Sequence, residues 1–243
     1  MADTATSSPE EVARFTAMAE SWWDPAGKFK PLHRFNPVRL AYLRRVLAEH
    51  FNRDSSQIAP FSGISLLDIG CGGGLLSEPI SRMGFTITGI DAGDRNIAIA
   101  KTHAEQTGLT IDYRVGGPET LDGTLYDVVI SMEVIEHVPD QQAFISQAAA
   151  RLKPGGIFVG ATMNRTAKAF ALAIVGAEYL LGWLPRGTHD WKKFARPAEF
   201  AGWLRQAGIE TTELVGATYD AVTGEWHESK SLDVNYMILG IKR

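Results

Sequence analysis

The sequence contains a single cysteine, Cys71, among its 243 residues. One thiol excludes an internal disulfide, and the absence of a CxxC pair argues against structural zinc, so the chain suits a reducing cytosol. No stretch reaches the ~20 uninterrupted apolar residues that span a bilayer. The polar first eight residues do not resemble a secretory signal. We therefore expect a cytoplasmic protein.

An excess of positive charge is also missing, because 24 Lys and Arg residues face 28 Asp and Glu residues. A net charge of -4 argues against nucleic acid as the main partner. The chain has no Ser-His-Asp elbow and no P-loop lysine motif, which argues against acyl hydrolases and NTPases. We find no second hydrophobic core and predict one domain over residues 1–243, with a helical N-terminal arm (1–55) and a helical insertion (165–195).

A glycine-rich turn between an apolar strand and a helix is the central motif of the chain. It reads D-x-G-x-G-x-G from Asp68 through Gly74. Glycines let a ligand approach the main chain closely, and the following helix offers unpaired N–H groups. A dinucleotide fingerprint needs its third glycine at position 75, where this chain has Leu75, so a nucleotide-dependent oxidoreductase is disfavoured. We interpret Cys71, inside the turn, as a small packing residue.

Strands and helices alternate along most of the chain. This alternation predicts an α/β, Rossmann-like fold with a mostly parallel seven-stranded sheet and helices on both faces. Ligands in such sheets bind beyond the carboxyl ends of the strands, where Gly70, Asp91 and Met132 fall. The seven strands are expected at 64–69, 85–90, 111–115, 126–132, 157–163, 209–215 and 234–241.

Two charged residues, Asp91 and Arg39, are interpreted from their positions in the sequence. Asp91 lies about 20 positions beyond the glycine turn, at the tip of the second strand, where an acid binds ribose hydroxyls; it could instead cap the helix expected over 95–106. Arg39 lies near the start of a helix expected from Asn36 to Phe51, off its main apolar face. From spacing alone, Arg39 is a solvated surface charge.

The segment Glu133-Val134-Ile135-Glu136-His137 follows the fourth strand directly. If this turn is helical, its two carboxylates and its imidazole share one face. Such a set suits Mg, Mn or Zn, although Glu136 and His137 can simply pair or cap the turn. His189 is a candidate fourth ligand, or a surface-loop histidine.

The segment from Arg165 to Leu184 is apolar and is bordered by basic residues. One interpretation is a helix packed on the core. The other is an interfacial segment or lid whose cations face anionic lipid at the inner face of the membrane. The bordering basic residues are Arg165, Lys168, Arg186, Lys192, Lys193 and Arg196.

These motifs, in this order, resemble class I S-adenosylmethionine (SAM) methyltransferases. Motifs nearer the two ends resemble the UbiG-type O-methyltransferases of ubiquinone biosynthesis, and the resemblance covers nearly the whole chain. The generic motifs are the glycine turn, Asp91, 126–138 and 152–156. The more specific motifs are 22–24, 29–34, 36–39, 175–179, 187–190 and 233–237.

The resemblance implies methyl transfer from SAM to a phenolic oxygen of a 2-polyprenyl-6-hydroxyphenol and of a 3-demethylubiquinol. It also implies contact with a polyprenylated substrate, with anionic lipid and with other enzymes of the pathway. Two alternatives stay open: O-methylation of another catechol or phenol, and a non-catalytic SAM-binding subunit.

The resemblance also assigns roles to residues. SAM contacts are implied for Arg39, Gly70, Asp91 and Met132, with Asp68 and Gly72 in the same turn. Related enzymes with Glu-x-x-Glu-His bind a divalent ion, which implies a metal at Glu133, Glu136 and His137. A catechol chelating that ion would lose its proton more readily, or one of these three residues would act as general base without metal.

Overall fold

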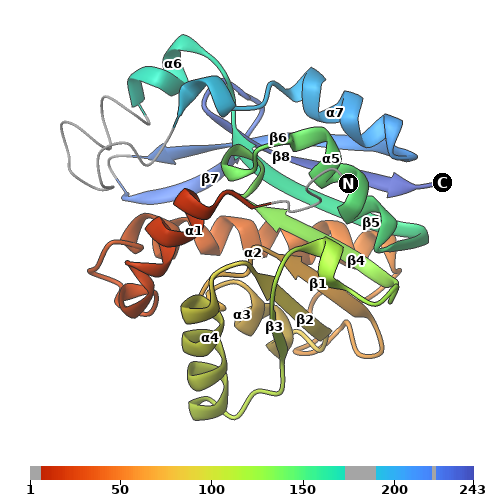
Figure 1. Cartoon of the computed structure of the whole chain (residues 1–243). Helices are drawn as coiled ribbons and strands as arrows, with labels where there is room; N and C mark the ends of the chain where they lie inside the picture. The colour runs from red at the N-terminus through yellow and green to blue at the C-terminus, as the bar shows by residue number, and fades with distance from the viewer. Residues whose placement is uncertain (1–6, 173–189, 221–222) are drawn as a thin grey trace.

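The computed structural model describes residues 7–172, 190–220 and 223–243, and these build one eight-stranded sheet in the order β3-β2-β1-β4-β5-β8-β6-β7 (Figure 1). Strands β1 to β5 are parallel, whereas β8 runs antiparallel to both β5 and β6, and β7 runs antiparallel to β6. The strands are β1 (Ser65–Ile69), β2 (Thr86–Asp91), β3 (Asp112–Val115), β4 (Tyr126–Met132), β5 (Leu152–Met163), β6 (Ile209–Asp220), β7 (Glu225–Ser229) and β8 (Asn235–Lys242).

Helices cover both faces of this sheet (Figure 1). Successive strand residues point to opposite faces, so Leu66 and Val128 pack with α2 and α3, while Leu67 and Val129 pack with α5 and α7. Helix α4 lies over β2 and β3. The helices are α1 (Pro9–Thr16), α2 (Lys30–His50), α3 (Ser77–Arg82), α4 (Asp94–Gln106), α5 (Gln141–Ala150), α6 (Ala167–Ala169) and α7 (Pro197–Gln206).

The predicted α/β fold is confirmed, but the predicted number of strands is wrong. The eighth strand is β7, whose sequence Glu-Trp-His-Glu-Ser has only one large apolar residue, Trp226. Because β7 is an edge strand that is nowhere fully buried, its sequence carries no run of apolar residues. Helix α2 also begins at Lys30, six residues before the expected Asn36, with Pro31 in its first turn and Pro37 inside it.

The carboxyl edge of the sheet is extended on one side by a hairpin. Residues Ile209–Gly216 of β6 pair with β8, and Gly216 also pairs with β7, whereas residues 217–220 continue beyond this pairing and pair with β7 alone. Since β6 runs in the same direction as β5, this hairpin projects past the edge where β1 to β5 end. Helix α2 packs against β7 there. Among the described helices, none is both long and apolar enough to cross a bilayer.

Candidate active site

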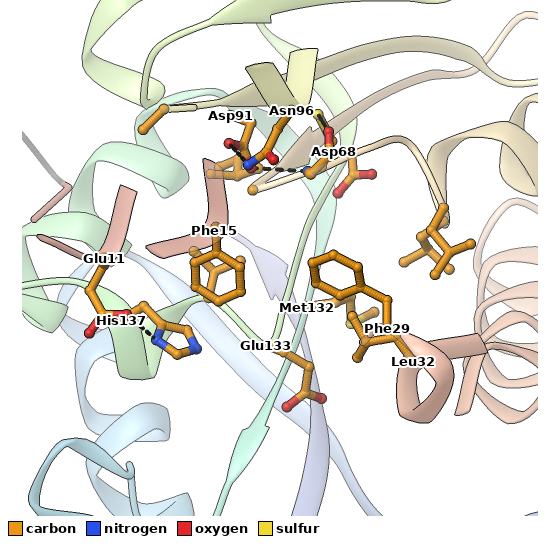
Figure 2. Close-up of a pocket in the computed structure, with 18 of the residues that line it drawn as sticks. Glu11, Phe15, Phe29, Leu32, Asp68, Asp91, Asn96, Met132, Glu133 and His137 are labelled. Atoms are coloured by element: carbon orange, nitrogen blue, oxygen red, sulfur yellow. Dashed lines mark hydrogen bonds and ion pairs between the residues drawn. The ribbon is translucent and has the colours of Figure 1, made fainter. Parts of the chain in front are cut away.

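A cavity of about 300 Å³ lies at the carboxyl edge of the sheet. Its lining follows the strand order from the loop after β3, through the ends of β2, β1, β4 and β5, to β8 and β7. The N-terminal arm, from helix α1 to the start of α2, supplies a further wall. Figure 2 shows Asp68, Asp91 and Asn96 at one end and Glu133 and His137 at the other, with Phe15 and Phe29 between them.

The glycine turn is covered by an indole ring from the N-terminal arm. A Cβ atom on Gly72 or Gly73 would overlap the ring of Trp22, and Gly72 has a φ of 54°. Trp22 stacks on Phe29 at 3.7 Å between ring centroids. The neighbouring Trp23 donates its indole N–H to the carbonyl of Gly73 at 2.9 Å. Glycine is therefore required here by close packing as well as by backbone geometry.

Asp91 is held by three hydrogen bonds at the tip of β2. Its Oδ2 accepts from the backbone N–H of Gly72 at 3.0 Å, and its Oδ1 accepts from the N–H of Gly93 at 2.8 Å and from Asn96 Nδ2 at 2.9 Å. Burial raises the pKa of this carboxyl, and the three donors oppose the rise. Asp91 therefore ties the start of α4 to the glycine turn and also lines the cavity.

Asp68 and Arg39 form a second buried charged group. Only 4% of Arg39 is exposed, so the solvated-charge interpretation is wrong. Burial lowers the pKa of Arg39, and the charges of Glu133 and Asp68 oppose that effect. Asp68 accepts a hydrogen bond from Ser77 Oγ at 2.5 Å, and burial raises its pKa to about 6. The guanidinium also lies 4.7 Å from the ring centroid of Phe35.

The turn after β4 is not an α-helix. Glu133 has a φ of 59°, and only a short 3-10 helix, Ile135–His137, follows it. Burial raises the pKa of Glu133 well above its usual range, and the adjacent Glu136 carboxyl adds to this rise. Glu136 accepts from Thr162 Oγ1 at 2.8 Å. Oε1 of each carboxyl is buried without a hydrogen-bond partner.

His137 is directed to the N-terminal arm. Its Nδ1 lies 3.0 Å from Oε2 of Glu11, and its ring meets Phe15 edge to face (Figure 2). Across the described residues, no three His, Cys, Asp or Glu side chains gather as metal ligands. The predicted set of Glu133, Glu136 and His137 is therefore not assembled by this arrangement. His189 lies outside the described residues.

The structure adds residues to the site that the sequence had not indicated. Asn96 donates to Asp91 and accepts from Trp22 Nε1 at 2.9 Å, and no sequence signal pointed to it. The Trp22–Trp23 pair belongs to a motif of the family resemblance and is typical of packing anchors, and the structure places it over the glycine turn. Met132, Gly70 and Gly72 line the cavity. The lone thiol of Cys71 is buried, which raises its pKa well above the usual value.

Comparisons with known proteins agree with this geometry. The model of a methyltransferase domain family matches residues 39–214. A ubiquinone biosynthesis O-methyltransferase from Paramagnetospirillum magneticum is 64% identical over 100% of this chain and 98% of its own length. An enzyme of the same name from Cereibacter sphaeroides is 50% identical over the full length of both chains.

Solved structures match in fold at low sequence identity. A magnesium protoporphyrin IX methyltransferase from Synechocystis PCC 6803, with bound SAH, has a TM-score of 0.61 at 18% identity and covers 96% of this chain and 94% of its own. A SAM-dependent methyltransferase from Thermotoga maritima has a TM-score of 0.60 at 18% identity, covering 94% of this chain and 100% of its own. The chain thus has the class I SAM methyltransferase fold and belongs to the family of ubiquinone biosynthesis O-methyltransferases.

Proposed function

We propose that this protein transfers the methyl group of SAM to a phenolic hydroxyl of 2-polyprenyl-6-hydroxyphenol and of 3-demethylubiquinol. Family membership at up to 64% identity supports the reaction. The observation that carries the proposal is the position of Glu133, a half-buried residue with a buried Oε1 directly after β4, in the middle of the cavity lining. It lies between a half suited to SAM and a half suited to an aromatic substrate.

The half over β1, β2 and β3 supplies the cofactor contacts. Three of the roughly four lone-pair sites of a carboxylate are used at Asp91, which leaves one on Oδ2 for a ribose hydroxyl. Arg39 offers a buried cation for the methionine carboxylate, and its Nε has no hydrogen-bond partner. Gly70, Gly72 and Met132 supply close backbone and side-chain contacts to SAM. The negative charge of Asp68 favours the charged form of Arg39.

Methyl transfer needs a phenolate, because a neutral phenol is a weak nucleophile. In our proposal the ionised Glu133 accepts the phenolic proton and can share it with Glu136. The phenolate oxygen then bonds to the sulfonium methyl as the C–S bond breaks and its electron pair passes to sulfur. A carboxyl with a raised pKa is a better acceptor for this proton. Most of the remaining rate enhancement comes from holding the phenolate oxygen in line with the sulfonium methyl.

A divalent ion is not needed in this route. Two unpartnered carboxylate oxygens are a suitable donor set for a hard cation, but His137 is directed to Glu11 and the predicted set is not assembled. We therefore derive no step through a metal. The role predicted for an ion stays a prediction that a chelator can test.

The function is tested by transfer of labelled methyl from SAM to both substrates with short prenyl tails. Glu133→Gln should lower kcat by about 100-fold or more, the usual contribution of a general base. Its SAM affinity should stay within a few fold of wild type. Glu105→Gln, an exposed site on α4, is the matched control.

Two results would redirect the proposal. No transfer by the wild-type protein to either substrate or to a simple catechol would favour a non-catalytic SAM-binding subunit. Activity that is lost with chelator and restored by Mg, Mn or Zn would favour the ion-assisted route over Glu133 alone.

We further propose that the insertion touches anionic lipid. Its described start exposes Phe170 by 44% and Leu172 by 54%, next to the cations Arg165 and Lys168. Co-sedimentation with phosphatidylglycerol vesicles should fall in Phe170→Ser/Leu172→Ser. It should persist in Ile58→Ser, which is 89% exposed elsewhere. Equal binding by all three proteins would contradict this contact.

A further inference from the structure

The cavity extends well beyond the point where methyl transfer is proposed to occur. Glu133 marks the end of β4, and the lining continues through Met163 at β5 and Asn235 at β8 to Trp226 on β7. Four strand spacings separate β4 from β7, which is ~19 Å at ~4.8 Å each. This reach exceeds a single quinol ring several times over, so the far end of the cavity faces another part of the substrate.

The far end is lined by Phe35 and Trp226, and Tyr219 packs against Trp226; we call these three aromatic side chains the aromatic wall. The rings of Phe35 and Trp226 lie 4.9 Å apart between centroids, and those of Tyr219 and Trp226 lie 5.4 Å apart. Phe35 is buried with Val38 of α2 and Ala217 of β6, and Trp226 packs against that cluster while staying half-buried.

The hairpin of β6 and β7 is what brings this wall to the cavity. Tyr219 and Trp226 are directly paired in the antiparallel register beyond the end of β8. Glu225 and His227, the neighbours of Trp226 on β7, are exposed, so the single apolar side chain of the strand is the one that lines the cavity. The guanidinium of Arg39 lies over the ring of Phe35, 4.7 Å from its centroid.

We propose that the aromatic wall binds the first isoprenoid units of the substrate's prenyl tail. This inference rests on the proposed function, because it takes the quinol ring to lie beside Glu133. Isoprenoid units are apolar and carry flat, branched double bonds that pack well on aromatic faces. Burying them on Phe35 and Trp226 removes apolar surface from water. The wall thus makes the enzyme selective for tailed over tailless rings without touching the reacting oxygen.

The test compares two substrates with the same ring, a demethylubiquinol with two prenyl units and its tailless analogue. Trp226→Ala should lower kcat/KM for the prenylated substrate about tenfold, a typical loss for one apolar contact surface. The value for the tailless analogue should change by less than about twofold. Trp226→Phe keeps an aromatic face and should recover part of the loss. Trp203→Ala, a half-buried tryptophan on α7, is the matched control.

The ratio of the two kcat/KM values is the readout, since it does not depend on how much protein is correctly folded. A ratio that stays unchanged in Trp226→Ala would overturn the inference, and an equal loss on both substrates is such a result. Binding of the prenylated quinol, measured by calorimetry without SAM, separates the two proposals. If wild type binds it more tightly than Trp226→Ala but transfers no methyl, the function fails and the aromatic wall stands.

Discussion

The side-chain amide of Asn96 bridges Asp91 and Trp22, donating to Asp91 Oδ1 at 2.9 Å and accepting from the indole N–H of Trp22 at 2.9 Å. Both ends of the amide are satisfied, so its orientation is determined by its two partners. Because Asn96 and Trp22 are buried, water cannot replace either bond cheaply. The N-terminal arm is therefore linked through one amide to the acid expected to bind ribose.

Loss of this bridge should weaken cofactor binding. We expect Asn96→Ala to raise the dissociation constant for SAM about tenfold, since one buried hydrogen bond to a charged group contributes about 1.5–3 kcal/mol. Trp22→Phe keeps the ring and loses only the N–H, so its effect should be smaller. Calorimetric titration with SAM measures both. Unchanged affinity in Asn96→Ala would show that Gly72 and Gly93 position Asp91 by themselves.

The contact between Trp22 and Gly72 predicts a steric conflict that can be relieved. Gly72→Ala combines a positive φ with overlap on the indole, and should lower the free energy of unfolding by about 2–4 kcal/mol. Gly108→Ala has a φ of 69° and open space around it, so it isolates the backbone cost of about 1–2 kcal/mol. Urea unfolding of both variants, alone and with Trp22→Ala, gives the comparison. If Trp22→Ala leaves the Gly72→Ala penalty unchanged, the overlap is not its cause.

Two arginines on α2 should behave differently on truncation. Arg39 is buried beside Asp68 and Glu133, whereas Arg45 is half-exposed and pairs with Glu213 and Glu228. We expect Arg39→Met to weaken SAM binding about 100-fold or more, because a buried charge loses its partner. Arg45→Met should leave SAM binding unchanged and alter stability by less than about 1 kcal/mol. Equal effects of the two variants would contradict the assignment of Arg39.

The buried Asp68 predicts a pH dependence of stability. Burial raises its pKa from 3.8 to about 6, so between these values the folded state keeps a proton that the unfolded chain releases. Its contribution to the free energy of unfolding therefore falls as pH rises across that window, by about 3 kcal/mol in total, and is constant above it. Chemical denaturation at several pH values should show a smaller loss with rising pH in Asp68→Asn than in wild type.

Ser77 supplies the control for this titration. Its hydroxyl donates to Asp68 and lowers the pKa of the carboxyl. In Ser77→Ala the upper end of the window should therefore move to higher pH. If the free energy of unfolding changes with pH in the same way in wild type, Asp68→Asn and Ser77→Ala, Asp68 is ionised in the folded protein across the whole window.

Much of the fold was readable from the sequence because its signals are local. The glycine turn and the apolar runs of β1, β2 and β4 each act within a few residues. They predicted the parallel sheet and placed Gly70, Asp91 and Met132 at one edge. The edge strand β7 escaped detection, since a strand that is nowhere fully buried needs no apolar run.

The sequence by itself determined the α/β class, the glycine turn and the family, because these depend on residue types at fixed spacing. Only the tertiary structure decided which charged groups are buried and which groups they interact with. Arg39 is buried on α2, and the carboxylates whose charges act on it, Asp68 and Glu133, are distant in sequence. Likewise, His137 meets Glu11 across 126 residues. Burial and long-range pairing arise from packing, and a spacing rule along the chain does not contain them.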